Sequence, residues 1–425
     1  MISFLKNIKI QFFFIFCLIP VALVSGPFLS DFIIVSFIFL FLFKKNIFFS
    51  DKFLIIEDKI LIILIILWVI FILSSIFSQY SLFSLKSSFF FLRWILFALI
   101  AGNLIYYHKD KIDLFFKFLL LTLLIVSIDG LIQYIFGQNI LGFEKVTRNR
   151  LSGFFNDELV LGSYLSKLYP LLLASYFFCF KKLKKKWHII LFITSACITL
   201  VIYLSAERAS FYHHVLFLAL LLLVFNYKKS KIKIIFLCCL VIITIFFLGI
   251  NDHKKFKRLS YPIKNFINKG SIFSDQHLAH FYSATKMFLD NKLIGVGPRL
   301  FRVLCADKRY NLDNIENHNI KKFENCSTHP HNTYIQILAE AGIFGFFMVS
   351  SLFLLVFFRI LRHFFFKMFK DKYIYENYEL CLLIAILVYF FPISTNGNFF
   401  NNWLNVFLSL YLAFNYFFLI LKRNK

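Results

Sequence analysis

The sequence predicts an all-α protein that crosses a membrane many times. Of its 425 residues, 60% are hydrophobic and 63 are phenylalanine, far above the usage of soluble proteins. Many apolar runs approach the roughly 20 residues that span a bilayer as a helix. The formal net charge of +25 is typical of a membrane protein whose lysines and arginines collect in cytoplasmic loops. No aromatic-basic motif of a nucleic-acid-binding protein is present, so we expect a lipid bilayer and no nucleic acid as partner.

The apolar runs predict about 12 spans. With a cytoplasmic N-terminus, the lysine-rich connections fall on the inner side, as in KKLKKK at 181–186. The three short outer connections hold only Lys86 and Arg208 between them. Both termini are therefore predicted inside. The spans lie at approximately 11–25, 28–43, 58–77, 88–106, 113–136, 157–178, 188–204, 209–226, 233–250, 332–358, 378–393 and 403–421.

This topology divides the chain into an N-terminal bundle of about nine helices at 1–250, a large outer loop at 251–331, and about three C-terminal helices at 332–425. The loop carries 14 Lys plus Arg against 7 Asp plus Glu, which makes the outer face attractive to an anionic ligand. HLAHFYSATKMFLDN at 277–291 predicts an amphipathic helix, and GVGPRLF after it predicts a turn.

Two of the eight cysteines, Cys305 and Cys326, fall in the outer loop, whereas the others fall in or at predicted spans. In an oxidising compartment we expect this pair to form a disulfide, the alternative being two free thiols. Closing about 20 residues would contribute on the order of 3 kcal/mol in the chain-entropy model. The link would hold the base of the loop beside the histidines that follow it.

The stretch CSTHPHNTYIQILAEAGIFG places His331 directly before the tenth predicted span. Asn332, Gln336 and Glu340 then recur every four residues and form one polar stripe on that helix. The stripe either lines a cavity or packs against a neighbouring helix. His329 is a poorer candidate base than His331 because Pro330 separates it from the helix, although the two could exchange roles.

Arg208 in SAERAS and Arg150 in RNRLSGFFNDELVLGSYL are outer-facing cations at predicted span boundaries. Charges at such depth usually face a cavity or a partner, and Glu207 and Glu158 are possible partners. Arginine matches phosphate oxygens, and histidine can accept a proton near neutral pH. Together they suit transfer from a lipid diphosphate, in which arginine stabilises the departing diphosphate and His331 activates a hydroxyl. Activity would then fall below about pH 6, near the ordinary histidine pKa.

Three segments in this order resemble the O-antigen ligase and O-antigen polymerase superfamily of bacterial inner-membrane proteins. They are RLSGFFNDELVLGSYL at 150–165, LSAERASF at 204–211, and DNKLIGVGPRLF at 290–301 followed by HPHNTYIQILAEAGIFG at 329–345. The histidine block with its downstream Glu-x-Gly-x-x-Gly is the specific part. The segments cover about 80 residues, and the fold implied is that of glycosyltransferases with polyprenyl-linked donors.

The resemblance implies a metal-independent, inverting glycosyltransferase without a cofactor, which uses an undecaprenyl-diphosphate-linked glycan at the periplasmic face of the inner membrane. The essential histidine of the family maps onto His331 and its essential arginine onto Arg208, whereas Arg150 matches less securely. Asn332, His329 and Glu340 would bind substrate. Some members have an arginine near the position of His277, and Arg299 or Arg302 could substitute for it here.

The acceptor divides this hypothesis into a polymerase acting on a growing glycan, a ligase acting on the lipid A core, and a protein O-oligosaccharyltransferase. The first two are favoured because no extra C-terminal module follows. A lipid-glycan flippase or transporter is the alternative from another class. It is disfavoured because no corresponding halves are detected and because the polar residues concentrate on one face.

Overall fold

The computed structural model describes residues 2–43, 58–146, 150–226, 253–312 and 322–424, and the regular elements in these ranges are all helices. Among the described residues, six helices are long and apolar enough to cross a membrane. They are α5 (Lys59–Ile76), α6 (Ser81–Tyr107), α7 (Ile112–Phe136), α9 (Lys185–Leu204), α17 (Thr333–Lys370) and α19 (Asn402–Arg423). Three shorter apolar helices are α3 (Pro27–Phe43), α10 (Arg208–Val224) and α18 (Asn377–Tyr389).

Helices occupy the predicted spans that fall within the described residues. The first predicted span is divided into α1 (Ile2–Cys17) and α2 (Ile19–Ala22), and the sixth is α8 (Leu161–Cys179). The predicted span at 233–250, and with it the proposed boundary after residue 250, lies outside the described residues. The all-helical class is therefore confirmed for the described chain, and the count of about 12 spans stays a prediction.

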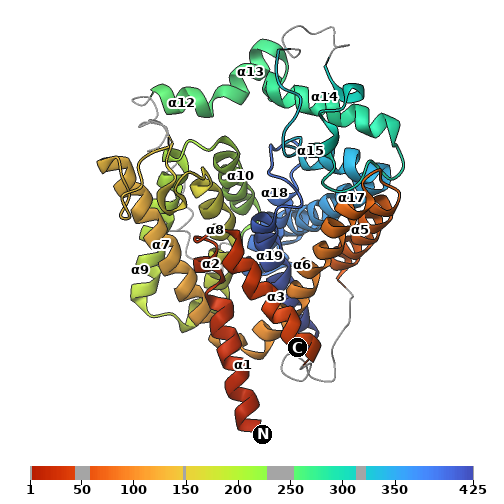
Figure 1. The fold of residues 1–425 in the computed structure, drawn as a ribbon. Coiled ribbons are helices and arrows are strands. Elements are labelled where there is room, and N and C mark those ends of the chain that lie inside the picture. Colours follow the sequence, from red (N-terminus) through yellow and green to blue (C-terminus); the bar gives the residue numbers. More distant parts are fainter. Residues whose placement is uncertain (1, 44–57, 147–149, 227–252, 313–321, 425) are drawn as a thin grey trace.

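The described residues of the segment between α10 and α17, 253–312 and 322–332, cover one end of the bundle, which we call the loop face (Figure 1). They contain α12 (His253–Leu259), α13 (Tyr261–Lys269), α14 (Asp275–Asp290) and α15 (Phe301–Leu304). Ser274 caps α14 by accepting a hydrogen bond from the backbone N–H of His277, so the helix predicted at 277–291 begins at Asp275. The start of α1 and the end of α19 (Asn402–Arg423) lie toward the opposite end of the bundle (Figure 1).

The loop is fixed to the bundle by a turn that enters a kink in α17. Gly342 has φ 65° and ψ −163° inside this helix, a conformation that is essentially restricted to glycine. The broken backbone exchanges hydrogen bonds with the turn: Val296 donates to the carbonyl of Ala339 at 2.9 Å, and Ile343 donates to the carbonyl of Lys292 at 2.9 Å. The 292–297 turn thus lies directly against the kink of α17.

A small apolar core stabilises this junction. Four fully buried residues form one cluster: Met287 of α14, Leu300 and Phe301 at the start of α15, and Ala339 of α17. The Glu340 carboxylate accepts a hydrogen bond from the backbone N–H of Phe301 at 3.0 Å. Because these contacts join elements far apart in sequence, the position of the loop depends on the α17 kink.

We expect Gly342→Ala to lower the free energy of unfolding by more than about 2 kcal/mol. A Cβ atom at Gly342 would lie 2.3 Å from the carbonyl oxygen of Leu293, a backbone atom that cannot rotate away. Gly270→Ala is the control. Gly270 also has a positive φ, 69°, but no atom lies within 4 Å of the Cβ that alanine would add there. Thermal unfolding of the detergent-solubilised variants measures both effects, and equal losses would contradict the packing explanation.

Candidate functional site

A cavity of about 1260 Å³ opens at the loop face between α8, α10, the loop segment and the α18–α19 connection. Its described lining includes six cationic side chains but only two carboxylates, those of Glu158 and Glu207. The cations are Arg150, Lys167, Arg208, Arg258, Arg299 and Arg302. The cavity thus combines an excess of positive charge with partial shielding from water, which strengthens its attraction for an anion.

Histidines gather on the side of the cavity formed by the loop. The ring of His331 lies 4.2 Å from that of His329, 5.2 Å from that of His277 and 5.3 Å from that of His280, measured between centroids. His331 itself has φ 62°, and its carbonyl accepts a hydrogen bond from Asn396 at 2.8 Å. Within the described residues, no group of three or more His, Cys, Asp and Glu side chains is placed to hold a metal ion.

Both ring nitrogens of His329 are engaged. Its Nε2 lies 3.1 Å from the carbonyl oxygen of Asn396, which can only accept, so Nε2 carries the proton. Its Nδ1 lies 2.9 Å from Oγ1 of Thr328. The ring of His331 is less constrained. Within the described chain its one hydrogen bond joins Nε2 to Oγ of Ser327 at 3.3 Å. This difference favours His331 as the residue that is free to accept a proton.

Burial and the neighbouring His280 lower the pKa of His331 to about 4. Burial likewise lowers the pKa of His329 to about 3, with His331 contributing. Both rings are therefore neutral at pH 7. The ordinary histidine pKa led us to expect that activity falls below about pH 6. With the lowered pKa of His331, we expect this fall at lower pH.

Arg150, Arg208 and Arg258 form a cationic cluster at the cavity, to which the loop segment contributes Arg258 from α12. Burial lowers the pKa of Arg150, with the neighbouring Arg258 as the next cause. Nε of Arg258 donates to the carbonyl of Ala206 at 3.0 Å, and the guanidinium of Arg208 lies 5.2 Å from the ring centroid of Tyr261. Arg258 was not identified from the sequence, because its position in a basic run resembles that of its solvated neighbours.

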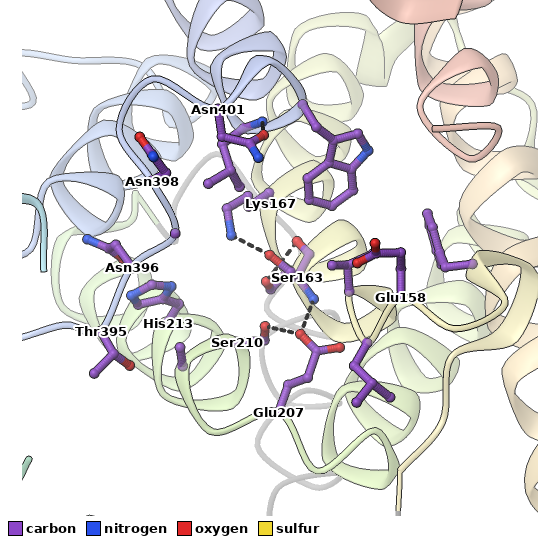
Figure 2. A pocket seen from close by; sticks show the side chains of 18 of the residues that line it. Glu158, Ser163, Lys167, Glu207, Ser210, His213, Thr395, Asn396, Asn398 and Asn401 are labelled. Carbon is purple, nitrogen blue, oxygen red and sulfur yellow. Dashed lines mark hydrogen bonds between the residues drawn. The ribbon is translucent and has the colours of Figure 1, made fainter. Parts of the chain in front are cut away.

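The carboxylates proposed as partners of these arginines are not paired with them in the described chain. Glu207 instead accepts hydrogen bonds from the backbone N–H groups of Gly162 (2.7 Å) and Ser163 (3.0 Å) and from Oγ of Ser210 (2.9 Å), as Figure 2 shows in part. It thereby caps the N-terminus of α8. Its carboxylate is bound by this helix end and, within the described residues, forms no ion pair with the cluster, although it still attracts Arg150 electrostatically.

Lys167 is a cavity residue that the sequence analysis missed. It lies in α8 one turn after Ser163, and its Nζ donates to Oγ of Ser163 at 2.6 Å (Figure 2). A single lysine in an apolar run carried no motif that would identify it. Its place in the cavity lining becomes evident only when α8, α10 and the α18–α19 connection are assembled.

Arg299 and Arg302 lie on the cavity beside the histidines. The Nε atoms of Arg150, Arg299 and Arg302 are buried and have no hydrogen-bond partner in the described part of the chain. Among the described residues, no ion pair involves any of the five cavity arginines. Buried donors of this kind are normally satisfied by a partner, which indicates a site for an anionic ligand.

Asn332 and Glu340 do not line the cavity. Asn332 caps α17 by accepting from the backbone N–H groups of Tyr334 and Ile335, and its Nδ2 donates to the carbonyls of Pro392 and Ser394. Glu340 is 1% exposed and is bound to Gln336 and Phe301. The polar stripe therefore positions α17 against the α18–α19 connection and the turn.

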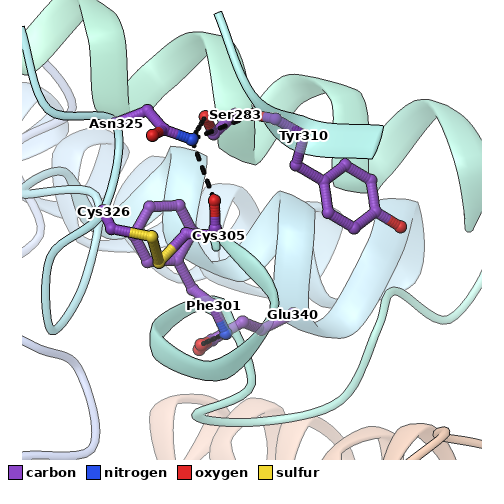
Figure 3. The surroundings of a disulfide bond; sticks show 7 residues. All are labelled: Ser283, Phe301, Cys305, Tyr310, Asn325, Cys326 and Glu340. Atoms are coloured by element: carbon purple, nitrogen blue, oxygen red, sulfur yellow. Dashed lines mark hydrogen bonds between the residues drawn. A yellow bond between two sulfur atoms is a disulfide. The ribbon is translucent and has the colours of Figure 1, made fainter. Parts of the chain in front are cut away.

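Cys305 and Cys326 form a disulfide in the structure (Figure 3). Beside it, Nδ2 of Asn325 donates to the carbonyls of Cys305 (2.9 Å) and Tyr310 (3.1 Å) and to Oγ of Ser283 (3.0 Å). These bonds hold the residues that precede His329 and His331 against α14 and α15.

Replacing Cys305 and Cys326 with serine should lower the free energy of local unfolding of α14 and α15 by about 3 kcal/mol. Hydrogen exchange of these helices measures the change. Reduced wild-type protein should match the double variant, and Cys197→Ser, which removes a free thiol, should leave the exchange unchanged. Unaltered exchange in the double variant would show that the disulfide contributes nothing here.

If His331 accepts a proton during turnover, activity should stay level from pH 7 to pH 5 and fall only as the pH drops through about 4, because the neutral ring is lost at its lowered pKa. His280→Gln should move this limit to higher pH, since it removes a neighbouring charge that lowers the pKa of His331. Initial rates in membrane vesicles test this, with thermal stability followed over the same range. A limit near pH 6 in the wild type would contradict it.

Comparison with known proteins supports the family that the motifs predicted. A family model described as O-antigen ligase matches residues 172–350, somewhat less than half of the chain. The matched region contains Arg208, Arg302, His329 and His331 but not Arg150. No curated protein matches the chain. The apolar helices and this match together indicate a multi-pass membrane protein, and they support its assignment to the O-antigen ligase superfamily.

Proposed function

We propose that the protein transfers a glycan from an undecaprenyl-diphosphate-linked donor to an acceptor hydroxyl at the periplasmic face of a bacterial inner membrane. The observation that carries this proposal is the joint placement of five arginines and His331 on one cavity. The family supports a ligase-like or polymerase-like activity. We also propose the identity of the donor and the acceptor, the membrane face on which transfer occurs, and the role of each residue.

In this proposal the arginine cluster holds the diphosphate of the donor. Arg150, Arg208 and Arg258 lie together on one side of the cavity, and guanidinium groups bind phosphate oxygens through parallel N–H donors. The negative charge on the diphosphate grows as it leaves, so fixed cations stabilise the transition state more than the ground state. These charges need no metal to act in this way.

His331 acts as the general base. The acceptor hydroxyl oxygen attacks the anomeric carbon of the donor sugar, the bond from that carbon to the diphosphate oxygen breaks, and His331 takes the hydroxyl proton. The undecaprenyl diphosphate leaves with the bonding electrons. Attack opposite to the leaving group inverts the anomeric configuration. Two observations support this role: Nδ1 of His331 has no hydrogen bond within the described residues, and the ring is neutral at pH 7.

Two acceptors share this scaffold: a growing polysaccharide for a polymerase and the lipid A core for a ligase. A protein hydroxyl, for an O-oligosaccharyltransferase, is the third. A flippase is less well supported, because the cavity that holds the five arginines and His331 opens at the loop face.

Cells that carry His331→Ala or Arg208→Ala should lose polymeric or core-attached surface glycan while keeping normal amounts of the protein. Removal of a general base costs roughly 10²–10⁴-fold in rate. Glycan profiling by electrophoresis measures the loss. Single repeats on the core would identify a polymerase, and long chains retained on undecaprenyl diphosphate would identify a ligase.

Arg309→Ala is the control for these variants. Arg309 belongs to the same loop but is exposed and pairs with Asp307 at 2.7 Å, so its loss should leave the glycan profile unchanged. An unchanged profile in both His331→Ala and Arg208→Ala would refute the proposed site and favour a transporter.

A further inference from the structure

The amphipathic helix α13 presents its apolar side away from the protein. Ile263, Phe266 and Ile267 follow the spacing of one helix face and are 56%, 57% and 74% exposed. Asn265, on the opposite side, is 6% exposed. Its Nδ2 donates to the carbonyls of Ser271 and Phe273, both at 2.8 Å. The orientation is the reverse of that of a surface helix on a soluble protein.

Contacts along α12, the helix that leads into α13, place it at the level where α7 ends and α10 begins. The ammonium of Lys255 lies 4.2 Å from the ring centroid of Tyr134, two residues before the end of α7. The hydroxyl of Tyr212, in the second turn of α10, donates to the carbonyl of Leu259 at 2.8 Å. In Figure 1, α12 and α13 run across the end of the bundle. Tyrosine is enriched at the membrane–water interface of membrane proteins, and Tyr134 and Tyr212 both make these contacts.

Positive charge around the apolar face also points to a bilayer surface. Lys254 and Lys257 of α12 and Lys264 of α13 are exposed. An apolar helix face flanked by lysines is the pattern of a helix that lies in the plane of a bilayer surface, where its apolar side chains enter the boundary between headgroups and acyl chains. Phosphate groups of the lipids then lie at the level of the lysines.

We propose that Ile263, Phe266 and Ile267 of α13 are immersed in the interface of the same bilayer that the spans cross, with Lys257 and Lys264 at its headgroups. The inference does not rest on the proposed function. It has a consequence for the cavity, because Arg258 and Tyr261 lie at the α12–α13 junction and face Arg208. The bilayer surface thereby positions one wall of the cavity.

Spin labels tested against two collision partners measure this placement directly. Molecular oxygen concentrates in the bilayer, whereas a nickel–EDDA complex stays in water. Ile263→Cys, Ile267→Cys and Asn268→Cys are labelled singly in the full chain, with Cys305 and Cys326 as the only other cysteines, and reconstituted into phosphatidylethanolamine–phosphatidylglycerol nanodiscs. Asn268 is the matched control because it is exposed on the same turn as Ile267 but off the apolar face.

Labels at 263 and 267 should collide several-fold more with oxygen than with the nickel complex, and the label at 268 should show the opposite preference. Equal access of the nickel complex to all three labels would place the face in water and overturn the proposal. Shielding of 263 and 267 from both reagents would also overturn it, since it would show that protein covers the face. Neither result depends on glycan transfer.

Discussion

The backbone contact between the 292–297 turn and the α17 kink is the constraint on which the loop side of the cavity depends. At Gly295, an added Cβ would lie 2.5 Å from the backbone of Glu340 and Ala341, so the two segments touch without side chains between them. Arg299 and Arg302 follow directly from this turn, and His331 lies one residue before the cap of α17. The contact therefore fixes arginines and histidine relative to one another as a single unit.

The opposite side of the cavity has its own fixed point at Glu207. Its carboxylate is satisfied by the N-terminus of α8 and by Ser210, which holds α8 and α10 together beneath the arginine cluster. A carboxylate placed a few ångströms away could have neutralised Arg208 or Arg150. Because it binds backbone N–H groups instead, the protein gains rigidity at this end while the cavity keeps its positive charge.

Much of this arrangement is predictable from the sequence, but unevenly. The span predicted at 113–136 agrees with α7 to one residue at its start, because long apolar runs leave few alternatives in a membrane. The cavity lining includes five residues that the sequence singled out, namely Arg150, Arg208, Arg302, His329 and His331. The kink at Gly342, by contrast, depends on backbone packing from a distant segment. Lys167 and Arg258 gain their place only through tertiary assembly, which local patterns do not encode.

The left-handed backbone conformation of His331 sets the stability of the protein against its proposed activity. With φ 62°, this position favours glycine or asparagine over most other residues, and either would relieve part of the conformational cost. If His331 is the base we propose, mutational drift toward the more stable residue would abolish turnover. Stability and activity therefore oppose each other at this one residue. A search for stabilised variants that excludes function would therefore select against the histidine.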